Sequence, residues 1–278
     1  MNRETRVALA AQTIGIINNG KYISANGNEV EVKAALQTAI THTRLYRPGD
    51  FPTEIVVAST ESKATTEVTA ESTLEATARL IATDPQCRPL LLNFASARNP
   101  GGGFLGGSQA QEESLARSSG LYATLTSQME MYEFNRRERS LLYSDHMIYS
   151  PDVPVFRNDR GRLLDAPYLA SFITAPAVNA GAMKKNEPQS LSLIEPTMAA
   201  RLRKLLWVAT QHQHTTLVLG AWGCGVFQNS PTMVASLFAE MLGPRGIFHG
   251  CFQHVVYAVY DRTEGQETLR TFQRILAV

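Results

Sequence analysis

Apolar residues recur every three or four positions in several stretches of the chain, a spacing that predicts amphipathic helices. The clearest case is residues 195–211, whose shared apolar face consists of Met198, Leu202, Leu205, Leu206 and Ala209. Over residues 3–19 the predicted apolar face consists of Val7, Ala10, Ala11, Ile14 and Ile17. Ser72 and Glu75 have the spacing of a capping box, which predicts a helix start. The predicted helices span residues 3–19, 32–42, 74–82, 111–127, 195–211 and 266–276, and a further helix begins at Pro231.

Short apolar runs bounded by turn residues predict strands between these helices. Pro151 separates two of the runs, and residues 181–192 form a polar segment that predicts a loop. Alternating strands and helices predict an α/β fold with three α/β/α layers and a mixed central sheet. We expect residues 51–278 to form the core domain and residues 1–50 a helical extension packed on it. The predicted strands are residues 54–59, 89–94, 147–150, 153–156, 169–174, 216–219 and 255–260.

The segment 93–120 combines an apolar strand, a glycine-rich loop and an acidic helix start. After the predicted strand come Pro100 and three glycines, Gly101, Gly102 and Gly103, and the next helix opens with Gln111, Glu112 and Glu113. Glycine-rich backbone can approach a ligand closely, and a helix N-terminus favours anions. This order predicts a site for a phosphate-bearing substrate. The alternative is an ordinary turn followed by two glutamates that favour the helix dipole.

A second strand and glycine loop occupy residues 215–229, and a helix start follows them. Residues 216–219 lead into Gly220, Gly223 and Gly225, and Ser230 and Pro231 then cap a helix. Such a loop can hold a diphosphate through its backbone N–H groups. The alternative is a tight turn with Phe227 in the core.

These two segments resemble a known family. Three glycines, seven residues and then Gln-Glu-Glu resemble the signature of poly(ADP-ribose) glycohydrolases, and NFASARNPGGGF resembles their bacterial branch. The second loop resembles the Gly-x-x-Gly-x-Gly-x-Phe loop of macrodomain-type hydrolases. The resemblance implies a macrodomain-like catalytic domain at residues 51–278, flanked by the extension at residues 1–50.

The resemblance implies hydrolysis of the ribose–ribose bond of poly(ADP-ribose), releasing ADP-ribose, without a metal or cofactor. It implies that Glu113 is the general acid and base, that Glu112 binds ribose hydroxyls and that Asn99 orients the leaving ribose. Neighbouring side chains on a helix diverge by about 100°, so we expect one glutamate rather than a flanking pair to do the chemistry. Glu61, Glu67 and Glu71 are expected to lie on a solvated face; the alternative that the resemblance implies is that one of them binds the adenine amino group. The implied substrate-binding set is Asn99, Gly101, Gly102, Gly103, Gln111, Gly223, Cys224, Gly225, Val226 and Phe227.

Composition limits the other possibilities. The net charge of +1 argues against a face for duplex nucleic acid. Three cysteines, Cys87, Cys224 and Cys251, lack metal spacing and suit a reducing compartment, and Cys224 is expected to be a small apolar filler. We find no signal pattern and no apolar run of about 18 residues, so we expect a cytoplasmic monomer. His212, His214, His249 and His254 could be imagined as a metal site, but helix-terminal or surface roles are expected for them. The arginines at 136, 137 and 139 are expected to be solvated or to meet the polymer.

Two other functions remain open at this point. Macrodomains include non-catalytic readers of ADP-ribose, although a reader does not need the acid at Glu113. A hydrolase that removes a single protein-linked ADP-ribose is the other alternative. ADP-ribosylated proteins are expected partners in either hydrolase case, and the family resemblance suggests the DNA damage response as context.

Overall fold

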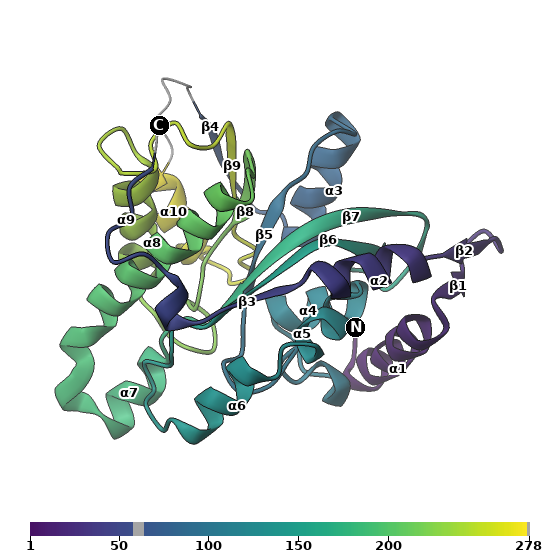
Figure 1. The fold of residues 1–278 in the computed structure, drawn as a ribbon, viewed down its shortest axis with the longest axis horizontal. Coiled ribbons are helices and arrows are strands. Elements are labelled where there is room, and N and C mark those ends of the chain that lie inside the picture. Colours follow the sequence, from purple (N-terminus) through teal and green to yellow (C-terminus); the bar gives the residue numbers. More distant parts are fainter. Residues whose placement is uncertain (58–63, 277–278) are drawn as a thin grey trace.

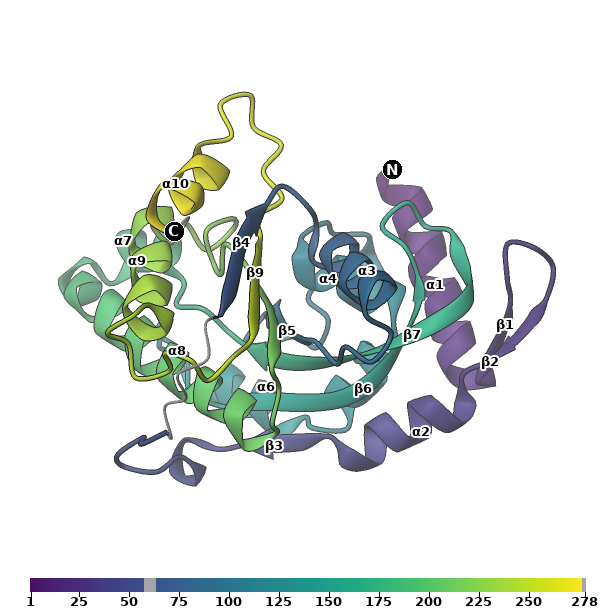
Figure 2. The same ribbon diagram turned by 90° about the horizontal axis from the view of Figure 1, so that it is seen from above.

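A seven-stranded mixed sheet forms the centre of the protein, with helices on both faces (Figures 1 and 2). The computed structural model describes residues 1–57 and 64–276. The strand order is β3-β6-β7-β5-β8-β9-β4; β4, β9, β8, β5 and β7 run parallel, and β6 is antiparallel to β7 and β3. The strands are β3 (Arg44–Tyr46), β4 (Thr65–Thr69), β5 (Leu90–Phe94), β6 (Met147–Arg157), β7 (Leu163–Ala175), β8 (Thr216–Leu219) and β9 (His254–Ala258). The predicted three-layer α/β/α class is confirmed.

Helices begin where the sequence offers caps. Ser72 and Glu75 form the predicted capping box, and Ser230 accepts from the Met233 N–H ahead of Pro231. The helices described are α1 (Arg3–Asn19), α2 (Lys33–His42), α3 (Thr73–Thr83), α4 (Gln111–Ser118), α5 (Leu121–Thr126), α6 (Glu130–Arg137), α7 (Ala180–Asn186), α8 (Ile194–Gln211), α9 (Pro231–Leu242) and α10 (Glu267–Leu276). Short 3₁₀ helices lie at Pro48–Asp50, Phe104–Gly106 and Pro188–Leu193. None of the helices in the described ranges is both long and apolar enough to cross a membrane.

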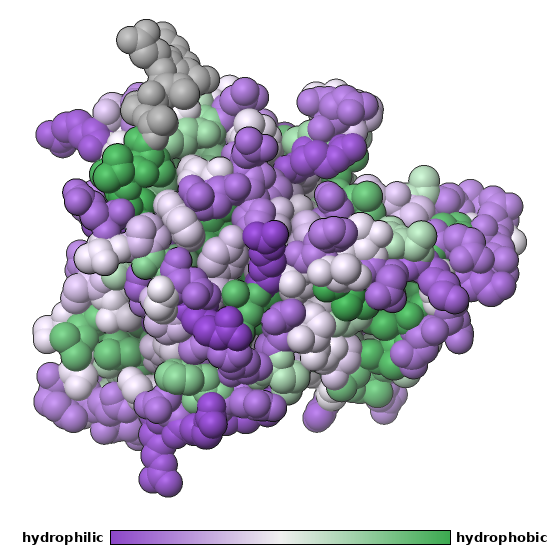
Figure 3. All heavy atoms as spheres, in the orientation of Figure 1, coloured by the Kyte–Doolittle hydropathy of each residue, from purple (hydrophilic) through white to green (hydrophobic). Residues whose placement is uncertain are grey.

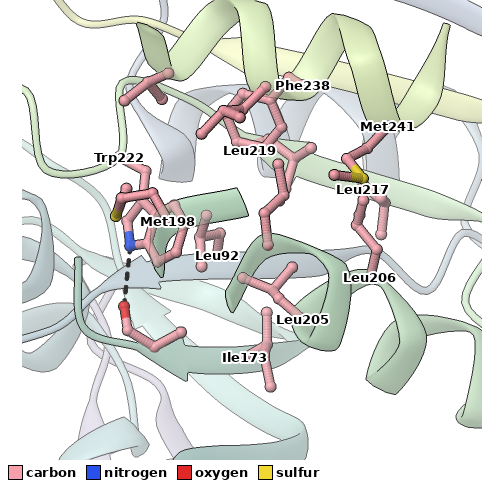
Figure 4. Packing of buried hydrophobic residues seen from close by; sticks show 14 of the residues in the cluster. Leu92, Ile173, Met198, Leu205, Leu206, Leu217, Leu219, Trp222, Phe238 and Met241 are labelled. Carbon is pink, nitrogen blue, oxygen red and sulfur yellow. Dashed lines mark hydrogen bonds between the residues drawn. The ribbon is translucent and has the colours of Figure 1, made fainter. Parts of the chain in front are cut away.

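The central strands are apolar at successive positions because both of their faces are buried. Leu90 and Leu92 face the larger core with Leu217 and Leu219, whereas Leu91 and Val218 face the smaller one. Figure 4 shows the larger core, where α8 and α9 pack on the sheet and the Trp222 ring lies beside Met198. All five residues of the predicted α8 face, Met198, Leu202, Leu205, Leu206 and Ala209, are buried.

The N-terminal residues contribute to the main sheet as well as to a helical layer. α1 is followed by a hairpin of β1 (Lys21–Ile23) and β2 (Glu29–Glu31), and α2 then leads into the edge strand β3. The predicted boundary near residue 50 therefore lies after a strand of the central sheet. The buried residues of α1 are Ala10, Thr13 and Ile16, whereas Val7 and Ala11 are exposed, so the predicted apolar face is rotated.

The strand predicted at residues 54–59 was wrong over its described part, and a strand that was not predicted lies nearby. Residues 54–57 form no strand, and residues 58–59 of the same prediction lie outside the described part of the chain. The strand in this region is instead the polar β4, which pairs in parallel with β9 at the edge of the sheet. An edge strand has solvent on one side, so apolar periodicity is weak there.

Three further elements differ from prediction. The helix predicted at 111–127 is broken at Ser119 and Gly120, where the Gly120 N–H donates to the Pro154 carbonyl, 2.9 Å away. Pro151 does not split β6; a register shift between Ser150 and Val153 absorbs it, with Asp152 at a φ of 45°. The segment 181–192 is mainly helical rather than a loop.

Candidate active site

The two glycine loops lie at the same edge of the sheet. The first follows β5 and the second follows β8, and these strands are parallel neighbours. β7 ends at this edge too, and the antiparallel β6 begins there, because Ile148 pairs with Thr174. The carboxyl edge of parallel strands is where ligands bind in α/β folds.

The first loop brings two carboxyl groups against the backbone of Gly102. Gly101 and Gly102 have φ values of 68° and 59°, which favour glycine. A Cβ on Gly102 would collide with Glu113 Oε1 and lie 3.0 Å from Glu112 Oε2. The missing side chain therefore makes room for both glutamates.

Glu112 is buried, with 3% of its surface exposed. Its Oε2 accepts a hydrogen bond from the Ser96 N–H at 2.7 Å, and its Oε1 lies 3.5 Å from the Asn93 Nδ2. Burial and, to a smaller extent, the nearby charge of Glu113 outweigh these hydrogen bonds and raise the pKa of Glu112 to about 8. The carboxyl group of Glu112 is therefore mainly protonated at neutral pH.

Glu113 is half-buried, and its Oε1 accepts a hydrogen bond from the Gly103 N–H at 3.0 Å. The two glutamates leave the helix in different directions, yet both carboxyl groups end beside Gly102. They share one side of the site and do not flank a bond from opposite sides. This arrangement fits chemistry by one glutamate, as expected from their spacing.

The backbone N–H groups of Gly101, Gly102 and Gly103, three of the expected substrate-binding residues, have partners within the protein. The Gly103 N–H binds Glu113, the Gly102 N–H donates to the Asn99 carbonyl at 3.0 Å, and the Gly101 N–H hydrogen-bonds to Glu112. These groups hold carboxyl groups and a turn rather than forming an open anion cradle.

The second loop has N–H groups that point to no protein partner. Among the hydrogen bonds of the described residues, none uses the backbone N–H of Gly225 or Val226. The Val226 side chain is 81% exposed. Trp222 anchors the loop through a hydrogen bond from its Nε1 to the Ala175 carbonyl, 3.0 Å long and drawn in Figure 4. Asn229 donates to the Val178 carbonyl at 2.7 Å, so the loop is held at both ends.

Tyr143 connects the two loops, a feature that the sequence analysis missed. Its ring lies 6.0 Å from the Phe227 ring and 5.6 Å from the guanidinium carbon of Arg98. Tyr143 has a φ of 58°, which is strained for a bulky residue. Asn93 and Ser96, which hold Glu112, were missed as well. The one sequence signal for these residues is that Asn93, Ser96 and Arg98 lie inside the motif NFASARNPGGGF.

The side-chain amide of Gln111, another expected substrate-binding residue, is hydrogen-bonded to β5. Its amide donates to the Leu92 carbonyl at 2.7 Å and accepts from the Phe94 N–H at 2.9 Å. The side chain therefore ties the start of α4 to β5. Asn99 is exposed at the turn, and Phe227 is half-buried at the edge of the larger core.

The remaining candidate residues have structural partners. Glu67 and Glu71 both bind Arg79, which holds the pKa of Glu71 below its usual range, and Glu61 lies outside the described residues. Burial raises the pKa of Cys224 to about 12, so it is an uncharged filler. His212 stacks on Tyr149 at the opposite edge of the sheet. No three His, Cys, Asp or Glu side chains gather as metal ligands within residues 1–57 and 64–276.

Comparisons with known proteins identify the family of the chain. Residues 10–158, more than half of the chain, match the family described as microbial-type PARG, catalytic domain. The structure resembles a poly(ADP-ribose) glycohydrolase from Thermomonospora curvata bound to the inhibitor ADP-HPD, with a TM-score of 0.90 and 44% identity over 98% of this chain and 99% of that one.

A second similar structure is a poly(ADP-ribose) glycohydrolase from Deinococcus radiodurans in complex with ADP-ribose. Its TM-score is 0.79, with 45% identity over 86% of this chain and 96% of that one. No match was found among curated proteins. The extent of the family match and these identities show that the chain belongs to the microbial-type poly(ADP-ribose) glycohydrolase family.

Proposed function

We propose that the protein hydrolyses the ribose–ribose O-glycosidic bond of poly(ADP-ribose), releases ADP-ribose, and uses Glu113 as its general acid and base. Membership of the family supports the reaction. The assignment to Glu113 rests on one observation: of the two carboxyl groups beside Gly102, only that of Glu113 is partly accessible. The catalytic residue must deliver a proton and then take one from an attacking water molecule, so it needs the solvent access that the enclosed Glu112 lacks.

In this mechanism Glu113 first protonates the ribose oxygen that leaves. The bond breaks through an oxocarbenium-like state, and a water molecule then attacks the anomeric carbon. The same carboxylate takes the proton from that water, so the residue returns to its starting state. The Gly103 N–H holds one oxygen of Glu113 and leaves the other for the proton.

Glu112 has a different role, as a buried hydrogen-bond partner of the substrate. A carboxyl group that stays protonated can donate a hydrogen bond to a ribose hydroxyl. The raised pKa of Glu112, about 8, supports this role. Its neutrality also limits the negative charge beside a substrate that carries a diphosphate.

The second loop is the proposed diphosphate site. The N–H groups of Gly225 and Val226 are unoccupied by any bond among the described residues, and they precede the N-terminus of α9. The first loop is not assigned this role, since its N–H groups hold the two glutamates.

The test is to incubate the protein with poly(ADP-ribose) and, separately, with protein carrying a single ADP-ribose, and to separate the products. We expect free ADP-ribose from the polymer. Release only from the singly modified protein would favour the mono-ADP-ribose hydrolase, and binding without release would favour a reader.

The Glu113→Gln variant belongs in the same assay. We expect its turnover to fall by about 10⁴-fold or more, because an amide cannot transfer the proton, while ADP-ribose affinity by calorimetry stays within a few-fold. Wild-type turnover in this variant would remove Glu113 from the mechanism.

We also propose that the protein acts as a cytoplasmic monomer on ADP-ribosylated proteins of the DNA damage response. The three scattered cysteines, which lack metal spacing, support a reducing compartment. Sedimentation of the purified protein tests the monomer, and fractionation of cells before and after DNA damage tests the location and context.

A further inference from the structure

Three consecutive carbonyl groups in the first glycine loop are each bound by a different arginine. Arg3 Nε donates to the Gly106 carbonyl at 2.9 Å, Arg6 Nε to the Gly107 carbonyl at 2.7 Å, and Arg117 Nη1 to the Ser108 carbonyl at 2.8 Å. Two of these arginines lie in α1, about a hundred residues away in sequence. The third lies in α4, the helix that carries Glu112 and Glu113.

The loop satisfies its own N–H groups but not these carbonyls. The N–H groups of Gly106 and Ser108 donate back to the Gly103 carbonyl, at 3.0 and 3.1 Å. The carbonyls of residues 106–108 therefore face outward, and the arginines are their partners. Arg6 also donates through Nη1 to the Gln109 side chain at 2.9 Å, which extends the contact toward α4.

Packing also holds α1 against the loop. A Cβ on Gly107, whose φ is 76°, would lie 2.7 Å from the Arg3 carbonyl and 2.9 Å from Val7. Phe104 is fully buried in a small cluster with Ala10 of α1 and Ala116 of α4. The loop is thus enclosed between α1 and α4.

The same helix also holds the far end of α4. Thr13 Oγ1 donates to the Arg117 carbonyl at 2.5 Å, and Arg157 donates to that carbonyl at 3.1 Å and to Gln12 at 2.8 Å. α1 therefore contacts the loop before α4 and the last turn of α4. Figure 2 shows α1 on the same side of the sheet as α4.

The first residue of this loop contacts the proposed catalytic group. Gly103, which opens the loop, donates its N–H to Glu113 Oε1 at 3.0 Å, and Glu113 lies one helical turn before Arg117. Movement of residues 104–109 would displace this N–H relative to the carboxyl group. Small displacements of a proton donor have large effects on rate.

We propose that α1 is a positioning element of the active site, in which Arg3 and Arg6 hold the glycine loop so that Gly103 keeps Glu113 aligned. The inference rests on the proposed role of Glu113. It assigns to the N-terminal helix a function in catalysis beyond packing.

The test is the double variant Arg3→Ala with Arg6→Ala, assayed on poly(ADP-ribose). We expect kcat to fall at least tenfold while KM changes less than threefold, because the second loop is untouched. Lysine at both positions should recover part of kcat, since an ammonium group can still donate to a carbonyl. Glu4→Ala, in the same helical turn but exposed and without a loop contact, should keep wild-type kcat.

Hydrogen exchange gives a readout that does not depend on activity. We expect the amides of Gly107 and Ser108 to exchange at least tenfold faster in the double alanine variant, with the thermal transition of the folded protein retained. If the wild-type protein releases no ADP-ribose, the proposed function fails while the exchange result still decides whether α1 holds the loop. Wild-type kcat together with wild-type exchange would overturn the inference, and so would an equal loss of kcat in Glu4→Ala.

Discussion

Glu112 and Glu113 are neighbours in sequence but differ in environment. Glu112 is enclosed and protonated near neutral pH, whereas Glu113 is partly accessible and held by one backbone N–H. Paired carboxyl groups commonly divide their roles because their environments differ. Here burial alone separates them, since both belong to the first turn of α4.

The raised pKa of Glu112 predicts how stability depends on pH. Below its ordinary pKa of 4.5 the carboxyl group is protonated in both folded and unfolded chains, so it imposes no penalty. At higher pH the unfolded chain releases a proton that the folded chain keeps, so stability falls until the pH passes about 8.

Glu112→Gln removes this dependence. Compared with the wild type, the free energy of unfolding of the variant should rise by about 1.4 kcal/mol for each pH unit between about 5 and 8. Urea denaturation of both proteins at pH 5 and pH 7.5 measures the difference. If the free energies of unfolding of the two proteins differ by the same amount at pH 5 and at pH 7.5, Glu112 is not protonated in the folded protein.

Gly102 is the position where an added methyl group would meet the two glutamates directly. In Gly102→Ala the Cβ would meet the Glu113 carboxyl group, and the φ of 59° disfavours alanine. We expect turnover on poly(ADP-ribose) to fall at least about a hundredfold. Gly49→Ala, whose Cβ would have open space, is the matched control; equal activity of the two variants would contradict the close contact.

At the level of elements, the second loop depends on its anchors. Trp222 is buried, packs in the larger core and donates to the end of β7, and Asn229 closes the loop on the other side. A glycine-rich loop gains its shape from such contacts, because its own backbone permits many conformations. The contacts of Trp222 and Asn229 therefore orient the backbone N–H groups of Gly225 and Val226.

Trp222→Phe tests this dependence. It removes the hydrogen bond to the Ala175 carbonyl and leaves a cavity, so we expect a loss of about 2–4 kcal/mol in stability and at least a fivefold weaker affinity for ADP-ribose. Thermal unfolding and calorimetry measure the two effects. Trp207→Phe, which changes the other tryptophan, half-buried on α8 against Tyr46 and Phe51, should leave affinity unchanged. Unchanged affinity for ADP-ribose in Trp222→Phe would show that the hydrogen bond of Trp222 is not needed for ligand binding.

For the whole molecule, the low net charge limits long-range attraction of a polyanion. The face shown in Figure 3 is mainly hydrophilic with scattered hydrophobic patches, and the net charge of the chain is +1. Recognition of poly(ADP-ribose) must therefore rest on local contacts at the two loops.

This predicts a weak salt dependence. Raising NaCl from 50 to 200 mM should change KM for poly(ADP-ribose) by less than about tenfold, whereas a protein with many phosphate contacts loses roughly 10³–10⁵ in affinity. Steady-state assays at several salt concentrations decide this. A steep dependence would point to an extended basic surface, with the arginines at 136, 137 and 139 as the first to replace.

The sequence by itself determined the elements whose signals are local. The apolar face of α8, the four residues of β8, the caps at Ser72 and Ser230 and the two glycine loops all follow from neighbours within a few positions. The polar edge strand β4 and the break at Gly120 escaped prediction because distant partners, β9 and Pro154, decide them.

Only the tertiary structure decided how the site is assembled. The burial that keeps Glu112 protonated, the contact of Tyr143 with Phe227 and the hold of Arg3 and Arg6 on the loop all join segments far apart in the chain. A carboxyl group's pKa and a loop's position depend on what packs around them in space. The sequence motif therefore supplied the chemical groups, and the fold determined which of them is exposed, protonated and aligned.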